Sequence, residues 1–287
     1  MIAAAASTAA AGEASAPAAE AAHGQGFDAG HYILHHILDS KTIEIPWSGR
    51  QIELPTIHLG SLDLSITRNV VMMWIASAIL LVLFSLAARR AKDPVPRGLR
   101  NVLETLVLWV RDDIARKNIG HGADRYLPFL LTLFFFVLAC NLLGLVPGMA
   151  TATSAIGVTA SLAAMTLFMI QWAGIREYGV VKHFKNLIPH GIPVLLLPVM
   201  IVVELLGVLS RPFALAIRLF ANMTAGHVII LSLIGLIFIL QTPWVGLAAV
   251  PFSLFIFLLE LLVAFIQAYI FTMLASLFIG MSAHPAH

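Results

Sequence analysis

Charged residues are scarce in this chain of 287 residues. Asp, Glu, Lys and Arg together make up 11% of the sequence, whereas a soluble domain has about 25%. Hydrophobic residues reach 60%, and the mean hydropathy is +0.92. The composition therefore excludes an ordinary soluble protein and indicates a protein that crosses the membrane several times.

Several kinds of functional motif are also missing. No glycine-rich phosphate loop with Lys and Ser or Thr occurs, so we expect no nucleotide site. No basic stripe with interleaved aromatic residues supports nucleic-acid binding, and no hydrolase or zinc motif lies at membrane depth. His31, His35 and His36 match no recognised metal motif and are interpreted as surface residues. We expect no cofactor, and we expect the one cysteine, Cys140, to be a buried, inert thiol.

The first 26 residues lack the basic start and the Leu-rich core of a secretory signal. They are mostly Ala with Gly, Ser, Glu and Pro, so we expect a disordered tail over residues 1–26, with a cleaved leader as the alternative. An outer-side segment over 27–68, a membrane channel domain over 69–280 and a cytoplasmic tail over 281–287 complete the expected organisation.

Five apolar runs are long enough to cross a bilayer, because a spanning helix needs about 20 residues. They lie near 69–88, 127–146, 155–175, 192–240 and 244–280. As one helix the fourth run would measure roughly 70 Å, so it must tilt strongly, break, or run partly along the interface. Pro198 and Pro212 could kink it, and the residues at 241–243 are typical of a turn between two helices.

The distribution of basic residues predicts the orientation. Residues 1–68 hold three Lys or Arg beside seven acids, whereas residues 89–125 hold nine beside five. Because loops rich in Lys and Arg stay in the cytoplasm, we expect the second segment there. With five crossings, the N-terminus lies outside and the C-terminus in the cytoplasm.

An amphipathic helix is predicted between the first two spans. Its apolar residues recur at helical spacing while charged residues occupy the other faces. We expect this helix to lie on the cytoplasmic surface, with membrane anchoring as its role and docking of a partner as the alternative. The apolar positions are Leu99, Val102, Leu103, Leu106, Val107, Val110 and Ile114.

Polar residues inside the fourth run form a stripe. Glu204, Arg211 and Arg218 are seven residues apart, and Asn222 follows Arg218 by four, so the four share one helix face. His227 comes nine residues after Arg218 and points to the other side. Arg211 is interpreted as reaching toward lipid headgroups. No acid lies three or four residues from Arg218, so its partner is expected on another helix or chain.

The fifth run carries a second stripe, formed by Ser253, Glu260 and Gln267 at the same seven-residue spacing. An ionised group at the bilayer centre costs roughly 2.5 to 3.5 kcal/mol and usually marks an ion path or a proton relay. His and a buried Glu can exchange protons near neutral pH, whereas Arg stays charged and is suited to be a fixed barrier.

The segment Arg211–His227 resembles the signature of subunit a of F-type ATP synthases. Its sequence is RPFALAIRLFANMTAGH. The resemblance extends to Glu204, Glu260 and Gln267 and, more weakly, to residues 141–147, so it covers roughly residues 69–280.

The resemblance implies an all-α polytopic membrane protein of five membrane helices, the last two a long, strongly tilted hairpin packed against a rotating ring of c subunits. Arg218 would face the ring carboxylate, with Asn222 and Gln267 nearby. His227 and Glu260 would line the half-channel open to the outside, and Glu204 the one open to the cytoplasm. Many bacterial members carry an acid and a His in the opposite order at these two positions.

The function implied is that of a stationary, non-catalytic proton-channel subunit that couples proton flow to rotation. Its partners would be the c ring, b-type peripheral stalk subunits, the F1 sector indirectly, and the lipid bilayer. The location would be a bacterial inner membrane, with the mitochondrial inner membrane as the alternative. An independent ion-coupled secondary transporter is the rival function, although we find no internal or inverted repeat of the kind that marks many of them.

Overall fold

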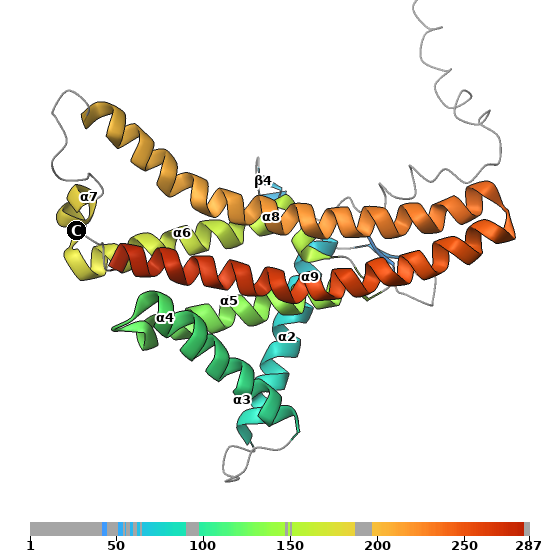
Figure 1. The fold of residues 1–287 in the computed structure, drawn as a ribbon, viewed down its shortest axis with the longest axis horizontal. Helices are drawn as coiled ribbons and strands as arrows, with labels where there is room; N and C mark the ends of the chain where they lie inside the picture. The colour runs from blue at the N-terminus through green and yellow to red at the C-terminus, as the bar shows by residue number, and fades with distance from the viewer. Residues whose placement is uncertain are drawn as a thin grey trace, which may run out of the picture.

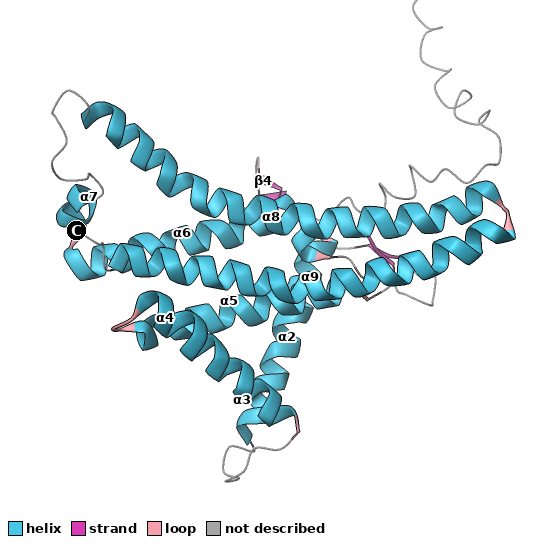
Figure 2. Cartoon of the chain, in the orientation of Figure 1, coloured by secondary structure: helices cyan, strands magenta, loops and turns pink. Residues whose placement is uncertain are grey.

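The computed structural model describes residues 42–44, 51–53, 55, 58–59, 62–63, 65–89, 98–146, 149, 151–186 and 197–283. Helices make up nearly all of this part of the chain (Figure 2). The predicted tail over 1–26 and the histidines at 31, 35 and 36 lie outside the described residues.

Two short antiparallel hairpins precede the first membrane helix. Strand β1 (Thr42–Glu44) pairs with β2 (Gln51–Glu53), and β3 (His58–Leu59) pairs with β4 (Leu62–Asp63). The sequence did not predict these strands, since runs of two or three residues are too short to show an alternating pattern.

Five described helices are long and apolar enough to cross a membrane. They are α2 (Arg68–Arg89), α5 (Ala123–Gly144), α6 (Ile156–Tyr178), α8 (Leu197–Leu240) and α9 (Pro243–Ala283). Each begins and ends within a few residues of a predicted apolar run. The prediction of an all-α polytopic membrane protein with five membrane helices is therefore confirmed.

Helices α8 and α9 form a long antiparallel hairpin (Figure 1). The chain reverses at Gln241, whose φ of 46° lies in the left-handed region, and at Thr242, whose hydroxyl donates to Leu240 O over 2.8 Å. Helix α8 remains unbroken through Pro212 and changes direction along its length in Figure 1. Its 44 residues correspond to about 65 Å of helix, more than twice the thickness of the hydrocarbon layer.

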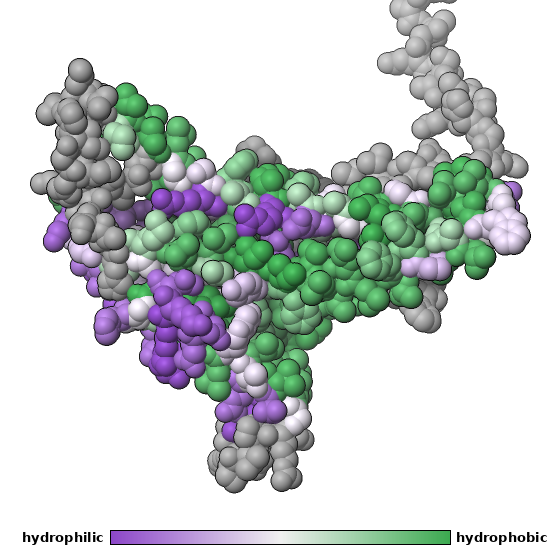
Figure 3. Space-filling view, in the orientation of Figure 1, coloured by the Kyte–Doolittle hydropathy of each residue, from purple (hydrophilic) through white to green (hydrophobic). Residues whose placement is uncertain are grey.

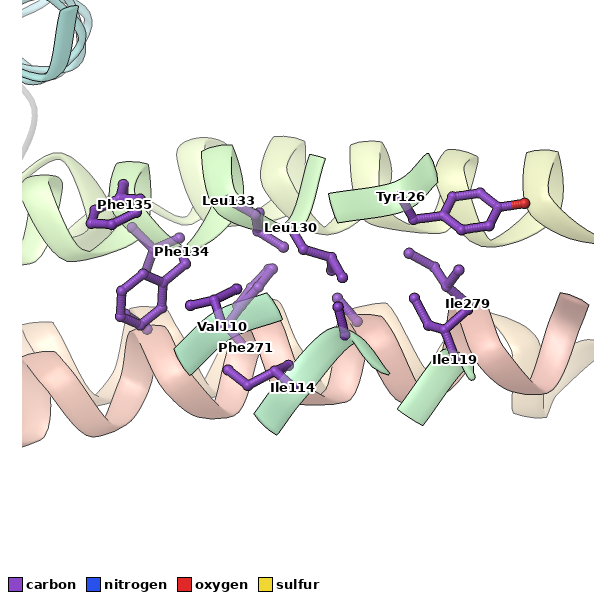
Figure 4. Close-up of a cluster of buried hydrophobic side chains, with 14 of the residues drawn as sticks. Val110, Ile114, Ile119, Tyr126, Leu130, Leu133, Phe134, Phe135, Phe271 and Ile279 are labelled. Carbon is purple, nitrogen blue, oxygen red and sulfur yellow. The ribbon is translucent and has the colours of Figure 1, made fainter. Parts of the chain in front are cut away.

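The predicted amphipathic helix exists, but it packs into the protein instead of only lying on a surface. Helix α3 (Leu99–Trp109) continues through a π-helical turn, η2 (Val110–Ala115), into α4 (Arg116–Ile119). These segments contact α5 and α9, and Figure 4 shows their side chains meeting those of both helices. The labelled residues are Val110, Ile114, Ile119, Tyr126, Leu130, Leu133, Phe134, Phe135, Phe271 and Ile279.

The rest of the protein covers only part of the apolar face of this helix. Leu99 and Val102 are 51% and 56% exposed, whereas Leu103, Val110 and Ile114 are buried. The buried residues are those that contact α5 and α9. The first turn of α3 extends beyond this contact.

Helix α4 is fixed to α9 by polar contacts and by a close approach of the backbones. Asn118 Nδ2 donates to Ser276 Oγ over 2.8 Å and to Ile114 O over 2.9 Å. A Cβ at Gly280 would lie 2.2 Å from Asn118 O, so only glycine fits there. The charged side chains of α4 form exposed ion pairs on the opposite side, such as Arg116 with Asp112, and hydrophilic surface gathers at α4 in Figure 3.

Candidate functional site

A His–Glu pair joins α8 to α9 in the middle of the bundle. His227 Nδ1 lies 2.8 Å from Glu260 Oε1 and 3.1 Å from Met223 O. Glu260 is 3% exposed, and neither of its carboxyl oxygens has a hydrogen-bond partner among the described residues that meets the usual geometry. Its contact with His227 is therefore the interaction that holds this buried carboxyl group.

The other side of the His227 ring faces the end of α5. His227 Nε2 lies 3.0 Å from Gly144 O and 2.8 Å from Thr151 Oγ1. Thr151 comes directly before η3 (Ala152–Ser154), a 3₁₀ turn that precedes α6. Four separate parts of the chain thus meet at one imidazole ring.

Two glycines make this approach possible. A Cβ at Gly226 would lie 2.6 Å from Glu260 Oε1, and a Cβ at Gly144 would lie 2.3 Å from Thr151 Oγ1. Both distances are shorter than any ordinary contact. The missing side chains therefore leave the space in which the carboxyl and hydroxyl groups approach the ring.

A second polar contact joins the two stripes along the same hairpin. Asn222 Nδ2 donates to Gln267 Oε1 over 3.0 Å. Gln267 is 1% exposed, and its Nε2 has no hydrogen-bond partner among the described residues. Ser253 Oγ is also buried without such a partner in the described part of the chain. The stripe on α9 therefore faces inward and holds polar atoms that fit bound water.

Arg218 lies on the side of α8 that points away from His227, because nine residues separate the two positions. It is exposed, and within the described ranges no residue forms an ion pair or hydrogen bond with it. Its neighbours Leu215 and Leu219 are fully buried, so the helix turns its apolar side inward and the guanidinium outward. Figure 3 shows hydrophilic patches on α8 within a largely hydrophobic surface.

Arg211, which the sequence indicates as reaching toward lipid headgroups, contacts α9 within the chain. Its Cζ lies 5.3 Å from the centre of the Phe278 ring on α9. A guanidinium over an aromatic face is attracted by the ring quadrupole, so Arg211 helps to hold α8 against the end of α9. Glu204 lies within α8, but its side chain is outside the described residues.

The weaker part of the sequence resemblance has a structural role beside the site. Asn141 of α5 is fully buried, accepts from Thr153 Oγ1 over 2.8 Å and contacts Ala264 O of α9 at 3.4 Å. This network fixes η3 and α9 to the end of α5. It therefore positions Thr151 and Glu260 around the same ring.

Sequence reasoning missed Thr151, Gly144 and Gly226. Gly226 had a usable signal, because it directly precedes His227 on a helix that packs against another helix. Thr151 had none, since its contact with His227 depends on how the connection between α5 and α6 folds back.

The fold and the site define a multi-pass α-helical membrane protein whose long hairpin carries a buried glutamate paired with a half-buried histidine, and an outward-facing arginine. A family model described as "ATP synthase A chain" matches residues 70–280. The chain belongs to the ATP synthase A chain family, and the resemblance noted at Arg211–His227 is confirmed.

Curated relatives agree over most of their length. The chain is 51% identical to ATP synthase subunit a of Pelodictyon phaeoclathratiforme, over 95% of this chain and 83% of the relative. It is 49% identical to ATP synthase subunit a of Chloroherpeton thalassium, over 88% of this chain and 77% of the relative. It is also 49% identical to that of Chlorobium phaeobacteroides strain DSM 266, over 100% of this chain and 85% of the relative.

Proposed function

We propose that this chain is the stationary proton-channel subunit of a rotary ATP synthase. One observation carries the proposal: a single helix bears a half-buried histidine paired with a buried glutamate and, nine residues before the histidine, an exposed arginine without a partner in the described residues. The first group can exchange protons, and the second cannot. A protein that only transmitted force would need neither group on an apolar membrane helix.

His227 and Glu260 form the proton-accepting part of the half-channel open to the outside. Protons then move toward Asn222 and Gln267, whose unsatisfied Nε2 supports a bound water on this route. Glu204 belongs to the half-channel open to the cytoplasm. The two half-channels are offset, so a proton crosses the membrane only while it is bound to a carboxylate of the rotating c ring.

Arg218 separates the two half-channels. A fixed positive charge favours the ionised form of a nearby carboxyl group, so a ring carboxylate that arrives opposite Arg218 releases its proton. The same charge repels a proton that would otherwise pass directly between the half-channels. The exposure of Arg218 on α8 supports this role, because the ring carboxylate must reach it from another subunit.

The assembly follows from this role. The c ring packs on the face of α8 that carries Arg218, b-type stalk subunits hold the chain stationary, and F1 is reached indirectly. The channel domain spans residues 69–280. The N-terminus lies outside and the C-terminus in the cytoplasm of a bacterial inner membrane, because the basic segment around α4 stays inside.

Purification of the tagged chain, followed by proton-flux measurement, tests the function. We expect a small-protein ring and stalk subunits to co-purify, and ATP to drive proton uptake into vesicles that contain the complex. His227→Ala and Glu260→Gln should each slow uptake, while the exchange His227→Glu with Glu260→His should retain more flux than either single variant.

Thr166→Val is the matched control, since Thr166 is buried and its hydroxyl donates to its own helix at Leu162 O. A chain that purifies alone and transports an ion without a ring would instead be an independent secondary transporter. Normal uptake by both single variants would remove His227 and Glu260 from the proton path.

A further inference from the structure

Four oxygen atoms surround the two ring nitrogens of His227. Nδ1 faces Met223 O and Glu260 Oε1, and Nε2 faces Gly144 O and Thr151 Oγ1. The two backbone carbonyls and an ionised carboxylate can only accept hydrogen bonds, whereas a threonine hydroxyl can donate or accept.

Neutral imidazole has one N–H group and one nitrogen with a free lone pair. A lone pair on Nδ1 would face a carbonyl and a carboxylate, both of which repel it. A lone pair on Nε2 also faces a carbonyl, Gly144 O, but in addition it faces the one oxygen that can donate to it, the hydroxyl of Thr151. With Glu260 ionised, neutral His227 is therefore satisfied in one tautomer, with its hydrogen on Nδ1.

We infer that Thr151 is a positioning residue that fixes this tautomer and presents Nε2 of His227 as the proton-accepting atom. The inference rests on the proposed function and deepens it, because it gives the proton path an entry atom. Protons reach the pair from the side of the α5 end and η3, and the His227 ring takes them up before Glu260 does.

The loading step changes few bonds. A hydrated proton on the side of Thr151 is transferred to the lone pair of Nε2, and its water is left neutral. The Thr151 hydroxyl turns from donor to acceptor, and Gly144 O accepts from the same new N–H group. The imidazolium then has both N–H groups directed at acceptors, and the Glu260 carboxylate balances its charge.

The fold holds Thr151 in place for this role. Thr151 is 3% exposed, and its carbonyl accepts from Ser154 N at 3.0 Å and from Ser154 Oγ at 2.7 Å. The missing side chain of Gly144 leaves room for its hydroxyl group. Thr224 of α8 also contacts Ser154 O at 3.5 Å, which holds η3 against α8.

Substitution of Thr151 in the assembled ATP synthase tests the inference. Thr151→Val keeps the shape and removes the hydroxyl, Thr151→Ala removes it in a smaller volume, and Thr151→Ser keeps it. We expect ATP-driven proton uptake per assembled complex to fall about 3- to 10-fold in the first two, the effect of one lost hydrogen bond of ordinary strength. Thr151→Ser should stay within about twofold of the wild type, as should the control Thr166→Val.

The tautomer itself is read from ¹⁵N NMR of histidine-labelled complex, with the His227 signals assigned by their loss in His227→Gln. In the neutral state the wild type and Thr151→Ser should carry the hydrogen on Nδ1. Thr151→Val should shift the population toward hydrogen on Nε2, which then donates to Gly144 O. A role of Thr151 in packing alone would leave this signature unchanged.

Four results separate a failure of this inference from a failure of the proposed function. Normal uptake by Thr151→Val and Thr151→Ala would overturn the inference, and so would slower uptake with an unchanged tautomer. If His227→Ala also pumps normally, the proposed function fails as well. If His227→Ala loses pumping while Thr151→Val does not, the inference about Thr151 alone is wrong.

Discussion

Gly226→Ala tests whether the carboxyl group of Glu260 must touch the His227 ring. The added Cβ would lie 2.6 Å from Glu260 Oε1, whereas ordinary contact begins near 3.4 Å. The oxygen must therefore move by about 0.8 Å. A movement away from α8 lengthens its 2.8 Å distance to His227 Nδ1 toward about 3.6 Å, beyond hydrogen-bonding range.

The cost in stability should be small compared with the cost in function. Alanine is favoured over glycine inside a helix by about 0.5 to 1 kcal/mol, and overpacking typically costs about 1 to 3 kcal/mol. The atoms that must move belong to the end of a flexible side chain, so the net loss should stay below about 2 kcal/mol. Misplacement of a reacting group by about 1 Å can reduce a rate about 100-fold, so we expect at least a tenfold loss.

The assay is ATP-driven proton uptake by proteoliposomes, normalised to the amount of assembled complex. Gly157→Ala is the control, because a Cβ at Gly157 would meet nothing within 4 Å. Wild-type uptake by Gly226→Ala would refute the reasoning, since it would show that proton transfer tolerates a displaced Glu260.

Three further predictions concern stability, pH and topology. Gly280→Ala should lower the melting temperature of the complex, because the added Cβ would meet the backbone oxygen of Asn118, which cannot move aside as a side chain can. An unchanged melting temperature would disprove the close approach of α4 to α9. Burial lowers the pKa of His183, so the folded protein should keep its full stability above about pH 6.5 and lose stability as the pH drops below that value. In thermal melts, the melting temperature of His183→Gln should fall less at acid pH than that of the wild type. An equal fall in both proteins would contradict this prediction. Thr242→Cys should label from outside sealed cells and Lys117→Cys only from the cytoplasmic side, whereas labelling of both from one side would contradict the topology.

The membrane helices could be predicted from the sequence because length and hydropathy alone determine a bilayer-spanning segment. The stripes on α8 and α9 were also readable, since residues seven apart share a helix face. The contacts of Glu260 with His227 and of Gln267 with Asn222 show that the stripe on α9 lies against α8.

The parts that failed depend on tertiary contacts. The apolar residues of the π-helical turn Val110–Ala115 recur in the sequence at the spacing of an ordinary amphipathic α-helix. The sequence therefore did not reveal the π-helical turn. The contact between Arg211 and Phe278 was likewise missed, because the two residues lie far apart along the chain.

The polar shell around His227 was equally hidden. Thr151 and Gly144 belong to the connection between α5 and α6, and nothing local marks either residue as a neighbour of α8. The titratable residues could therefore be identified from the sequence by their residue types, whereas the groups that orient them could be identified only from the folded structure.

The central claim is that Arg218 is the barrier between two half-channels. The most direct measurement compares Arg218→Ala with the wild type in proteoliposomes, for both ATP-driven proton uptake and passive proton leak under an imposed membrane potential. We expect uptake to be abolished and the leak to increase, because the charge that blocks direct passage is gone. Near-normal uptake at equal assembly, without added leak, would contradict it.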